Sequence, residues 1–145
     1  MRTYLIPILP KPKPRPRLTG SYGRFCHDPE YVAWQRDVRA AIVDAYGAPE
    51  PLAGFFEAHM VFRFPTKPRG DLDNLYAGVI DALQPPGARG QQGPPELYPG
   101  ILWLDDCKLR RMSCWWEPSW DGVIELTVGP WVPPQRPRKP RKAAR

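Results

Sequence analysis

The stretch KPRGDLDNL, residues 67–75, is followed about thirty residues later by a second acidic stretch, WLDD, at residues 103–106. Asp71 and Asp73 are two positions apart, a spacing that places side chains on one face of an extended segment but separates them by about 200° on a helix. We therefore place both aspartates on extended backbone. A hard cation prefers oxygen ligands and is usually held by one or two carboxylates, so the two stretches together indicate a divalent-metal site.

A helix is expected directly after the first acidic stretch. Apolar residues recur at helical spacing from Leu75 through Val79 to Leu83, which predicts a helix that begins near Asp73 or Asn74. A simpler alternative is that the aspartates only cap this helix, where the helix dipole favours acidic side chains. The spacing of the aspartates alone leaves that alternative open.

Three segments in this order resemble a known family signature. RGDLDNL (69–75), IDAL (80–83) and WLDD (103–106) are similar to the RusA-type Holliday-junction resolvases, small DNA endonucleases common in phages and prophages. The segment PRPR (14–17) is also similar to that family, and the resemblance covers roughly residues 3–129. The combination is more specific than any one segment. The resemblance implies a RusA-like α/β (α+β) fold and a hydrolase of DNA recombination and repair that uses Mg²⁺ or Mn²⁺.

The resemblance also assigns residues to roles. It implies that Asp71, Asp73 and Asp106 are the catalytic and metal-binding aspartates, with Asp105 as a further metal ligand and Asp81 as a neighbour. It further implies a homodimer that cuts two strands of like polarity in a four-way DNA junction. A two-fold dimer carries two equivalent sites, which suits the two equivalent phosphates of such a junction.

Two departures from the family pattern bear on activity. The family often carries a functional lysine in the helix, and Ala77 occupies that position here. The link between helix and second acidic pair is expanded to residues 84–100, with five prolines and four glycines in 17 residues. Four residues are candidates to supply the positive charge that this lysine would have given: Lys67, Arg69, Lys108 and Arg111. Two alternatives therefore remain, a nuclease for other branched DNA and a catalytically inactive junction-binding protein.

The charge distribution suits an enzyme that acts on a polyanion. The net charge is +6, yet residues 1–25 and 132–145 hold twelve of the 21 basic side chains and no acidic one, so the remainder carries −6. Basic segments attract the phosphate backbone, while a metal can neutralise an acidic centre. The residues expected to bind DNA are Lys11, Lys13, Arg15, Arg17, Lys67, Arg69, Lys108, Arg110 and Arg111. The proline-rich segment could instead be a rigid spacer or an SH3-type ligand.

Length and composition predict one domain. The 145 residues suffice for one hydrophobic core, and we expect a RusA-like endonuclease domain over residues 1–131. It includes the basic arm (residues 11–17) and the loop (residues 84–100), and a basic tail expected to be disordered follows at residues 132–145. The tail could equally serve only solubility. No apolar run approaches the roughly 18 to 20 residues of a membrane span, and no secretory pattern opens the chain, so a cytoplasmic protein is expected.

The three cysteines do not follow zinc-finger spacing. Cys26, Cys107 and Cys114 lack a C-x₂-C pair, and we interpret them as reduced structural thiols. A zinc site that combines them with His27 is a weaker alternative.

The remaining pattern predicts a mixed, mostly antiparallel sheet against two principal helices. Alternation of apolar and polar residues predicts strands at residues 3–9, 54–64, 107–116 and 123–128. The last two strands are expected to form an antiparallel hairpin, and residues 19–25 a turn or hairpin tip. A helix is expected from Asp28, with Pro29 at its first position, to Gly47, because Asp is a favoured N-cap and Gly a favoured helix end.

Overall fold

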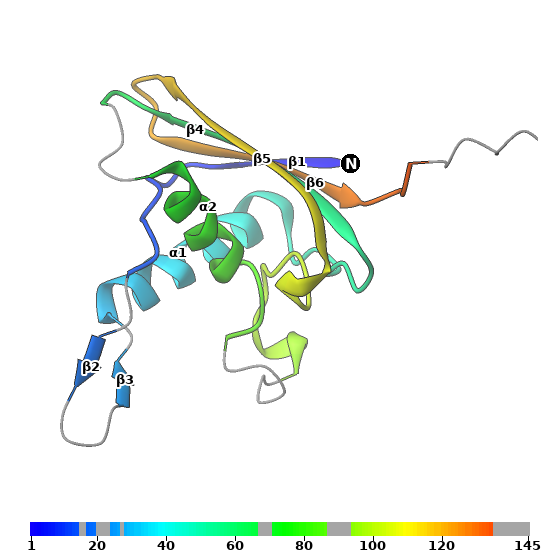
Figure 1. Cartoon of the computed structure of the whole chain (residues 1–145), viewed down its shortest axis with the longest axis horizontal. Coiled ribbons are helices and arrows are strands. Elements are labelled where there is room, and N and C mark those ends of the chain that lie inside the picture. Colours follow the sequence, from blue (N-terminus) through cyan, green and yellow to red (C-terminus); the bar gives the residue numbers. More distant parts are fainter. Residues whose placement is uncertain (15–16, 20–23, 27, 67–70, 87–93, 135–145) are drawn as a thin grey trace, which may run out of the picture.

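The computed structural model describes residues 1–14, 17–19, 24–26, 28–66, 71–86 and 94–134, with only the backbone described at 17–19 and 24–26. One four-stranded sheet and two α-helices form the body (Figure 1). The sheet order is β1-β6-β4-β5, where β1 is Arg2–Ile6, β6 is Val123–Pro130, β4 is Phe56–Phe64 and β5 is Leu109–Pro118. A separate pair, β2 (Arg17–Thr19) and β3 (Arg24–Cys26), runs antiparallel. The single-domain α+β fold with a mixed, mostly antiparallel sheet is confirmed.

Helix α1 spans Pro29–Tyr46 and follows the sequence signals at both ends. The Asp28 carboxylate accepts a hydrogen bond of 2.9 Å from the Glu30 amide, which satisfies one of the free N–H groups at the start of the helix. The helix ends at Gly47, whose φ of 76° lies in the left-handed region that glycine tolerates. Of the apolar residues at helical spacing, Tyr31, Trp34, Val38 and Ile42 are buried, whereas Val32 and Tyr46 are 38% and 44% exposed.

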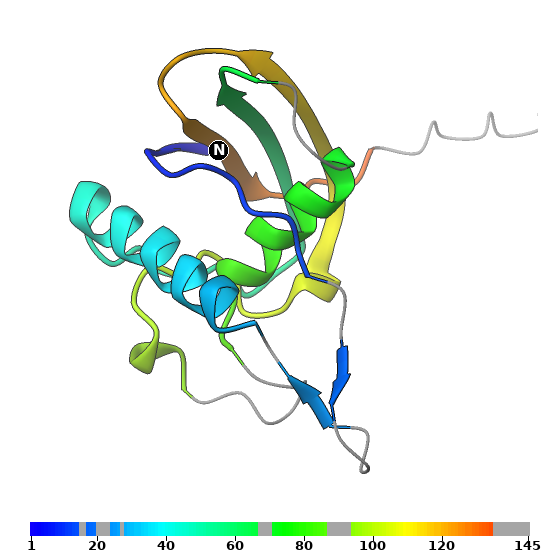
Figure 2. The same ribbon diagram turned by 90° about the vertical axis from the view of Figure 1, so that its left-hand side faces the viewer.

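Strand β4 is the centre of the sheet. Its even-numbered residues from Phe56 to Phe64 are all buried, and they face the helices because successive side chains of a strand alternate between faces. Figure 2 shows both helices on one side of the sheet. The apolar face of β4, α1 and the second helix therefore enclose the core, whose largest fully buried side chain is Trp103.

The prediction that the last two strands form an antiparallel hairpin is wrong. Strand β4 lies between β5 and β6, and it pairs parallel with β5 and antiparallel with β6. Residues 119–122 connect β5 to β6 across the end of β4, where the Ser119 amide donates to the Phe64 carbonyl at 3.3 Å. Alternation along β5 and β6 predicts strands but carries no information on their partners. Insertion of β4 gives this most apolar strand a neighbour on each side.

Helix α2 spans Leu72–Ala82 and crosses over between the parallel strands β4 and β5. It begins earlier than the sequence pattern predicts. Asp71 is the N-cap, with extended backbone angles (φ −80°, ψ 142°), whereas Asp73 lies in the first helical turn. The placement of Asp71 on extended backbone is confirmed, and that of Asp73 is wrong because the helix takes in the residues up to its cap. None of the helices in the described part of the chain is long and apolar enough to cross a membrane.

Candidate functional site

The first acidic pair lies at the N-terminal end of α2. Asp71 and Asp73 are both exposed, and Asp71 makes no capping hydrogen bond although it holds the N-cap position. An N-cap carboxylate usually accepts a hydrogen bond from the first turn, so the Asp71 oxygens remain available to solvent. The helix dipole stabilises negative charge at this end. Asp71 and Asp73 thus form an anionic site that can attract a cation.

Strand β5 packs against this end of α2. The Cys114 thiol lies 3.9 Å from the Leu72 carbonyl oxygen. Burial raises the pKa of the Cys114 thiol, and the negative charge of Asp73 raises it further. Cys114 therefore lies near enough to Asp73 for the carboxylate charge to act on the thiol.

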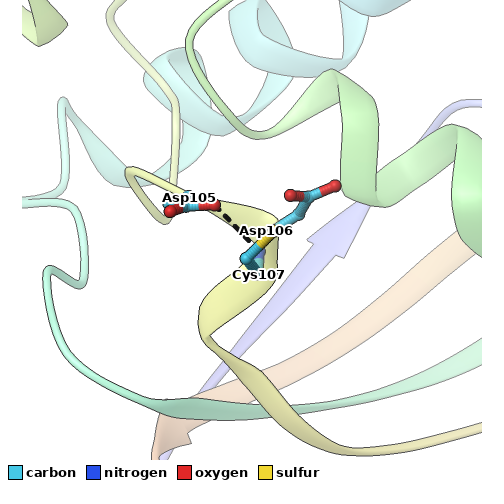
Figure 3. A group of neighbouring side chains, drawn as sticks. All are labelled: Asp105, Asp106 and Cys107. Carbon is cyan, nitrogen blue, oxygen red and sulfur yellow. Dashed lines mark hydrogen bonds between the residues drawn. The ribbon is translucent and has the colours of Figure 1, made fainter. Parts of the chain in front are cut away.

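The second acidic pair belongs to a short 3-10 helix, η2 (Asp106–Lys108), just before β5. Ligand atoms of Asp105, Asp106 and Cys107 all lie within 4.8 Å of one another (Figure 3), the one such group of three among the described residues. The Asp105 carboxylate caps η2 by accepting a 2.9 Å hydrogen bond from the Cys107 amide. The Asp106 amide donates to the Gln84 side-chain oxygen at 3.2 Å. Both contacts fix the backbone that carries Asp106.

The two acidic pairs do not form one compact group in this structure. Among the described residues, the ligand atoms of Asp71, Asp73 and Asp106 do not all lie within 4.8 Å of one another. Gln84 follows the C-terminal end of α2, so its contact places the Asp106 backbone nearer that end of the helix. Eleven helical residues span about 16 Å. Figure 3 nevertheless shows the Asp106 carboxylate directed toward α2 rather than away from it.

The basic arm lies along α2. The Lys13 amide donates to the Asn74 carbonyl at 3.1 Å, and Lys13 Nζ lies 2.7 Å from an Asp81 carboxylate oxygen. Lys11 Nζ forms an ion pair of 3.1 Å with Glu30. Asp81 is therefore the partner of an arm lysine. Arg15, Lys67 and Arg69 lie outside the described residues, and for Arg17 only the backbone is described.

Two of the basic residues expected to bind DNA, Lys108 and Arg110, lie beside the ring of Phe55. The sequence analysis did not predict this contact. The Arg110 guanidinium stacks 3.9 Å from the Phe55 ring centroid, and Lys108 Nζ lies 5.4 Å from it. Arg110 also donates to the Cys107 carbonyl at 2.8 Å, so it supports η2. Arg111 is 71% exposed and lies 3.9 Å from Glu57.

The contact between the Gln84 side chain and the Asp106 amide was also not predicted from the sequence. A single glutamine beside a run of prolines belongs to no recognisable motif. The cysteines show no zinc cluster among the described residues: neither Cys107 nor Cys114 is in a disulfide, and Cys114 is absent from the group that contains Cys107. The weaker zinc alternative cannot be followed further, since His27 lies outside the described residues.

Comparison with known proteins agrees with this arrangement of motifs. A search of curated proteins found no match. The family model described as endodeoxyribonuclease RusA matches residues 7–88, more than half of the chain. The match includes the basic arm, α1, β4 and α2 with Asp71 and Asp73, whereas Asp105 and Asp106 lie beyond it. The chain therefore belongs to the RusA family of endodeoxyribonucleases.

Proposed function

We propose that this protein is a Mg²⁺- or Mn²⁺-dependent endodeoxyribonuclease that resolves four-way DNA junctions as a homodimer. The observation that carries the proposal is the match to the RusA family over a segment that contains the Asp71–Asp73 motif. The motif follows the central strand β4 and caps α2. Groups at such a junction are held by regular structure on either side.

The donor atoms at these positions fit a hard cation. Asp71, Asp73 and Asp106 offer carboxylate oxygens, the ligands that Mg²⁺ and Mn²⁺ prefer. Asp105 is a further donor, although one of its oxygens caps η2. When bound, a divalent ion supplies Lewis-acid activation of water and neutralises charge at the scissile phosphate. The task of these side chains is to hold the ion, and that of Gln84 and Arg110 is to position η2.

Basic residues would orient the DNA around this centre. Lys108 follows Asp106 in η2, and Arg111 lies farther along in β5, beside Glu57. Both would supply positive charge on this side of the molecule, in the absence of a lysine at Ala77. On sequence grounds the same role extends to Lys67 and Arg69, to the arm at 11–17 and to the tail at 132–145. Phosphate contacts of this kind give affinity without sequence preference and weaken with salt.

One other function has support from specific observations. Ala77 replaces the functional helix lysine of the family, and Asp106 is not grouped with Asp71 and Asp73. Both observations favour a catalytically inactive protein that keeps junction binding. A nuclease for other branched DNA would differ only in substrate.

A cleavage assay separates these functions. End-labelled four-way junction and linear duplex are incubated with the protein in Mg²⁺, in Mn²⁺ and without metal. We expect paired cuts in the junction alone, with 5′-phosphate products. Asp71→Asn, Asp73→Asn and Asp106→Asn should each abolish cleavage and spare binding, whereas Asp44→Asn, the same charge change on the exposed side of α1, should cut normally. Absence of cuts with either metal would leave the inactive junction-binding protein.

The tail gives a separate test of the DNA contacts. Deletion of residues 132–145 removes six basic side chains and should weaken junction binding and flatten its salt dependence. An unchanged salt slope would show that the tail does not contact DNA.

A further inference from the structure

A link of 17 residues, 84–100, separates α2 from the segment that carries the second acidic pair. It includes the short 3-10 helix η1 (Pro95–Leu97), and its residues 87–93 lie outside the described part of the chain. The entropic cost of bringing the two ends of a connection together rises with its length. The position of Asp105 and Asp106 relative to α2 therefore depends on the contacts that hold the two ends of this link together.

Arg39 of α1 contacts both ends of the link. Its Nη1 donates a hydrogen bond of 2.8 Å to the carbonyl oxygen of Ala82, the last residue of α2. Its backbone lies against Gly100, where a Cβ would be only 2.4 Å from the Arg39 carbonyl oxygen. Gly100 is buried and has a φ of 87°, in the left-handed region that favours glycine. One residue of α1 thus holds the end of α2 and the end of the link.

The end of α2 is a suitable partner for the Arg39 guanidinium. The last carbonyl groups of a helix have no partner within the helix, and the helix dipole favours a cation at this end. Burial, and then the charge of Arg36, lower the pKa of Arg39. An arginine nevertheless stays charged in a protein, and a half-buried charge requires a hydrogen-bond partner. The Ala82 carbonyl supplies that partner.

The segment after Gly100 is held to the same end of α2. The backbone amides of Leu102 and Trp103 donate to the Leu83 carbonyl at 2.9 and 3.4 Å. The Trp103 indole, which is fully buried, donates to the Ile80 carbonyl at 3.2 Å. Asp105 follows Trp103 by two residues. The placement of Gly100 against α1 is therefore passed along four residues of fixed backbone to the second acidic pair.

We infer that Arg39 is a positioning residue for the second acidic pair: it holds together the two ends of the link 84–100 and so fixes Asp105 and Asp106 near the C-terminal end of α2. The inference rests on the proposed function for the role of these aspartates as metal ligands. Arg39 acts through the backbone at Ala82 and Gly100, not through contact with an ion. It complements Gln84, whose side chain holds the Asp106 amide itself.

Substitution of Arg39, studied without DNA, tests the inference. Arg39→Met keeps an extended side chain and removes the hydrogen-bond donors. The Asp106 and Cys107 amide signals should shift in NMR spectra, and hydrogen exchange at the Asp106 amide should become on the order of 10-fold faster. Mn²⁺ affinity, measured by electron paramagnetic resonance, should fall about 10-fold, as is typical when the support of a metal ligand is lost.

Two further variants separate positioning from a general effect of the charge. Arg39→Lys keeps a cationic donor and should recover most of the wild-type amide shifts and Mn²⁺ affinity. Arg36→Met is the matched control, since it makes the same change at an exposed position of α1, and it should behave like the wild type. Thermal melts establish that each variant is folded at the assay temperature.

Gly100→Ala tests the second contact of Arg39 independently. The added Cβ would meet the Arg39 carbonyl, and alanine is strained at the φ of 87°. This variant should shift the same two amides, of Asp106 and Cys107, and weaken Mn²⁺ binding although the Arg39 side chain is intact.

Two results would overturn the inference. One is an Arg39→Met protein that melts at a lower temperature but keeps the wild-type Asp106 and Cys107 amide signals and Mn²⁺ affinity, because the contact would then serve stability alone. The other is an equal loss in Arg36→Met. A wild-type protein that binds no Mn²⁺ or cuts no junction, while Arg39→Met still displaces the two amides, would remove the proposed function and leave the positioning by Arg39 in place.

Discussion

Lys13 Nζ lies 2.7 Å from a carboxylate oxygen of Asp81, so a lysine expected to bind DNA is paired with an acid of α2. Lys13 is 47% exposed and Asp81 19% exposed, so the pair sits at the surface of the arm and helix. An exposed ion pair contributes only about 0.2–1 kcal/mol to stability. In the proposed complex with DNA its greater effect would be on binding, because Asp81 neutralises a charge that phosphate would otherwise meet.

The first prediction concerns this pair. Asp81→Asn should free the Lys13 charge and raise junction affinity at low salt by about 2–5-fold, with a steeper salt dependence because one more phosphate is neutralised. Fluorescence anisotropy with labelled junction at several salt concentrations measures both quantities. Adding Lys13→Ala to Asp81→Asn should return the affinity to wild type or below. Equal affinity and salt slope in the wild type and Asp81→Asn would show that Lys13 does not contact DNA.

A substitution at Gly78 of α2 tests whether the basic arm packs directly against this helix. A Cβ at this glycine would lie 2.5 Å from the Lys11 carbonyl oxygen, a backbone atom that cannot rotate away. Alanine gains about 0.8–1 kcal/mol of helix propensity over glycine, but the clash and the loss of the Lys13–Asn74 hydrogen bond oppose this gain. We expect Gly78→Ala to lower the free energy of unfolding by about 1–2 kcal/mol.

Urea denaturation measures this loss, and hydrogen exchange at the Lys13 amide reports displacement of the arm. Gly54→Ala is the control, since a Cβ there meets no atom within 4 Å, and its stability should change by less than about 0.5 kcal/mol. A more stable Gly78→Ala protein with a protected Lys13 amide would contradict the observed contact.

Cys114 gives a pH-dependent prediction. Burial and the Asp73 charge both raise the pKa of its thiol, so the stability gained by keeping the thiol neutral is present below the ordinary cysteine pKa and is lost as pH rises through the raised value. Asp73→Asn removes the charge but not the burial. We expect it to shift alkylation of Cys114 to lower pH while leaving the value above that of an ordinary cysteine.

Peptide-resolved mass spectrometry after timed iodoacetamide treatment follows Cys114 alone. Exposed Cys107 serves as the internal reference for reagent activity. An identical pH profile of Cys114 in the wild type and Asp73→Asn would show that the Asp73 charge does not reach the thiol.

Local signals predicted the elements well, and long-range pairing was the part they missed. Asp28 and Gly47 fix both ends of α1, and the apolar alternation of β4 fixes its buried face. The residues of β5 and β6 do not determine which strands they pair with. The short connection between them is compatible with a hairpin and also with a connection that passes over one intervening strand. In this sheet β4 lies between β5 and β6, a central position that suits it as the most apolar strand.

The candidate site shows the same division. The Asp71–Asp73 motif and its helix follow from residues close in sequence, and the family match covers them. The position of Asp106 depends on the crossover from β4 through α2 to β5 and on the contact with Gln84. Neither leaves a local pattern. The grouping of Asp71, Asp73 and Asp106 around an ion therefore stays a prediction.

Gln84 should position Asp106 through the hydrogen bond that its side-chain oxygen accepts from the Asp106 amide at 3.2 Å. Loss of a group that orients a metal ligand typically costs about 10–100-fold in metal affinity or activity. Gln84→Ala should therefore weaken Mn²⁺ binding, measured by electron paramagnetic resonance, about 10-fold and shift the Asp106 amide signal in NMR spectra. Gln84→Glu keeps an acceptor oxygen at this position and should retain the signal. If Gln84→Ala bound Mn²⁺ like the wild type while the Asp106 amide shifted, η2 would be held by Gln84 but would not carry a metal ligand.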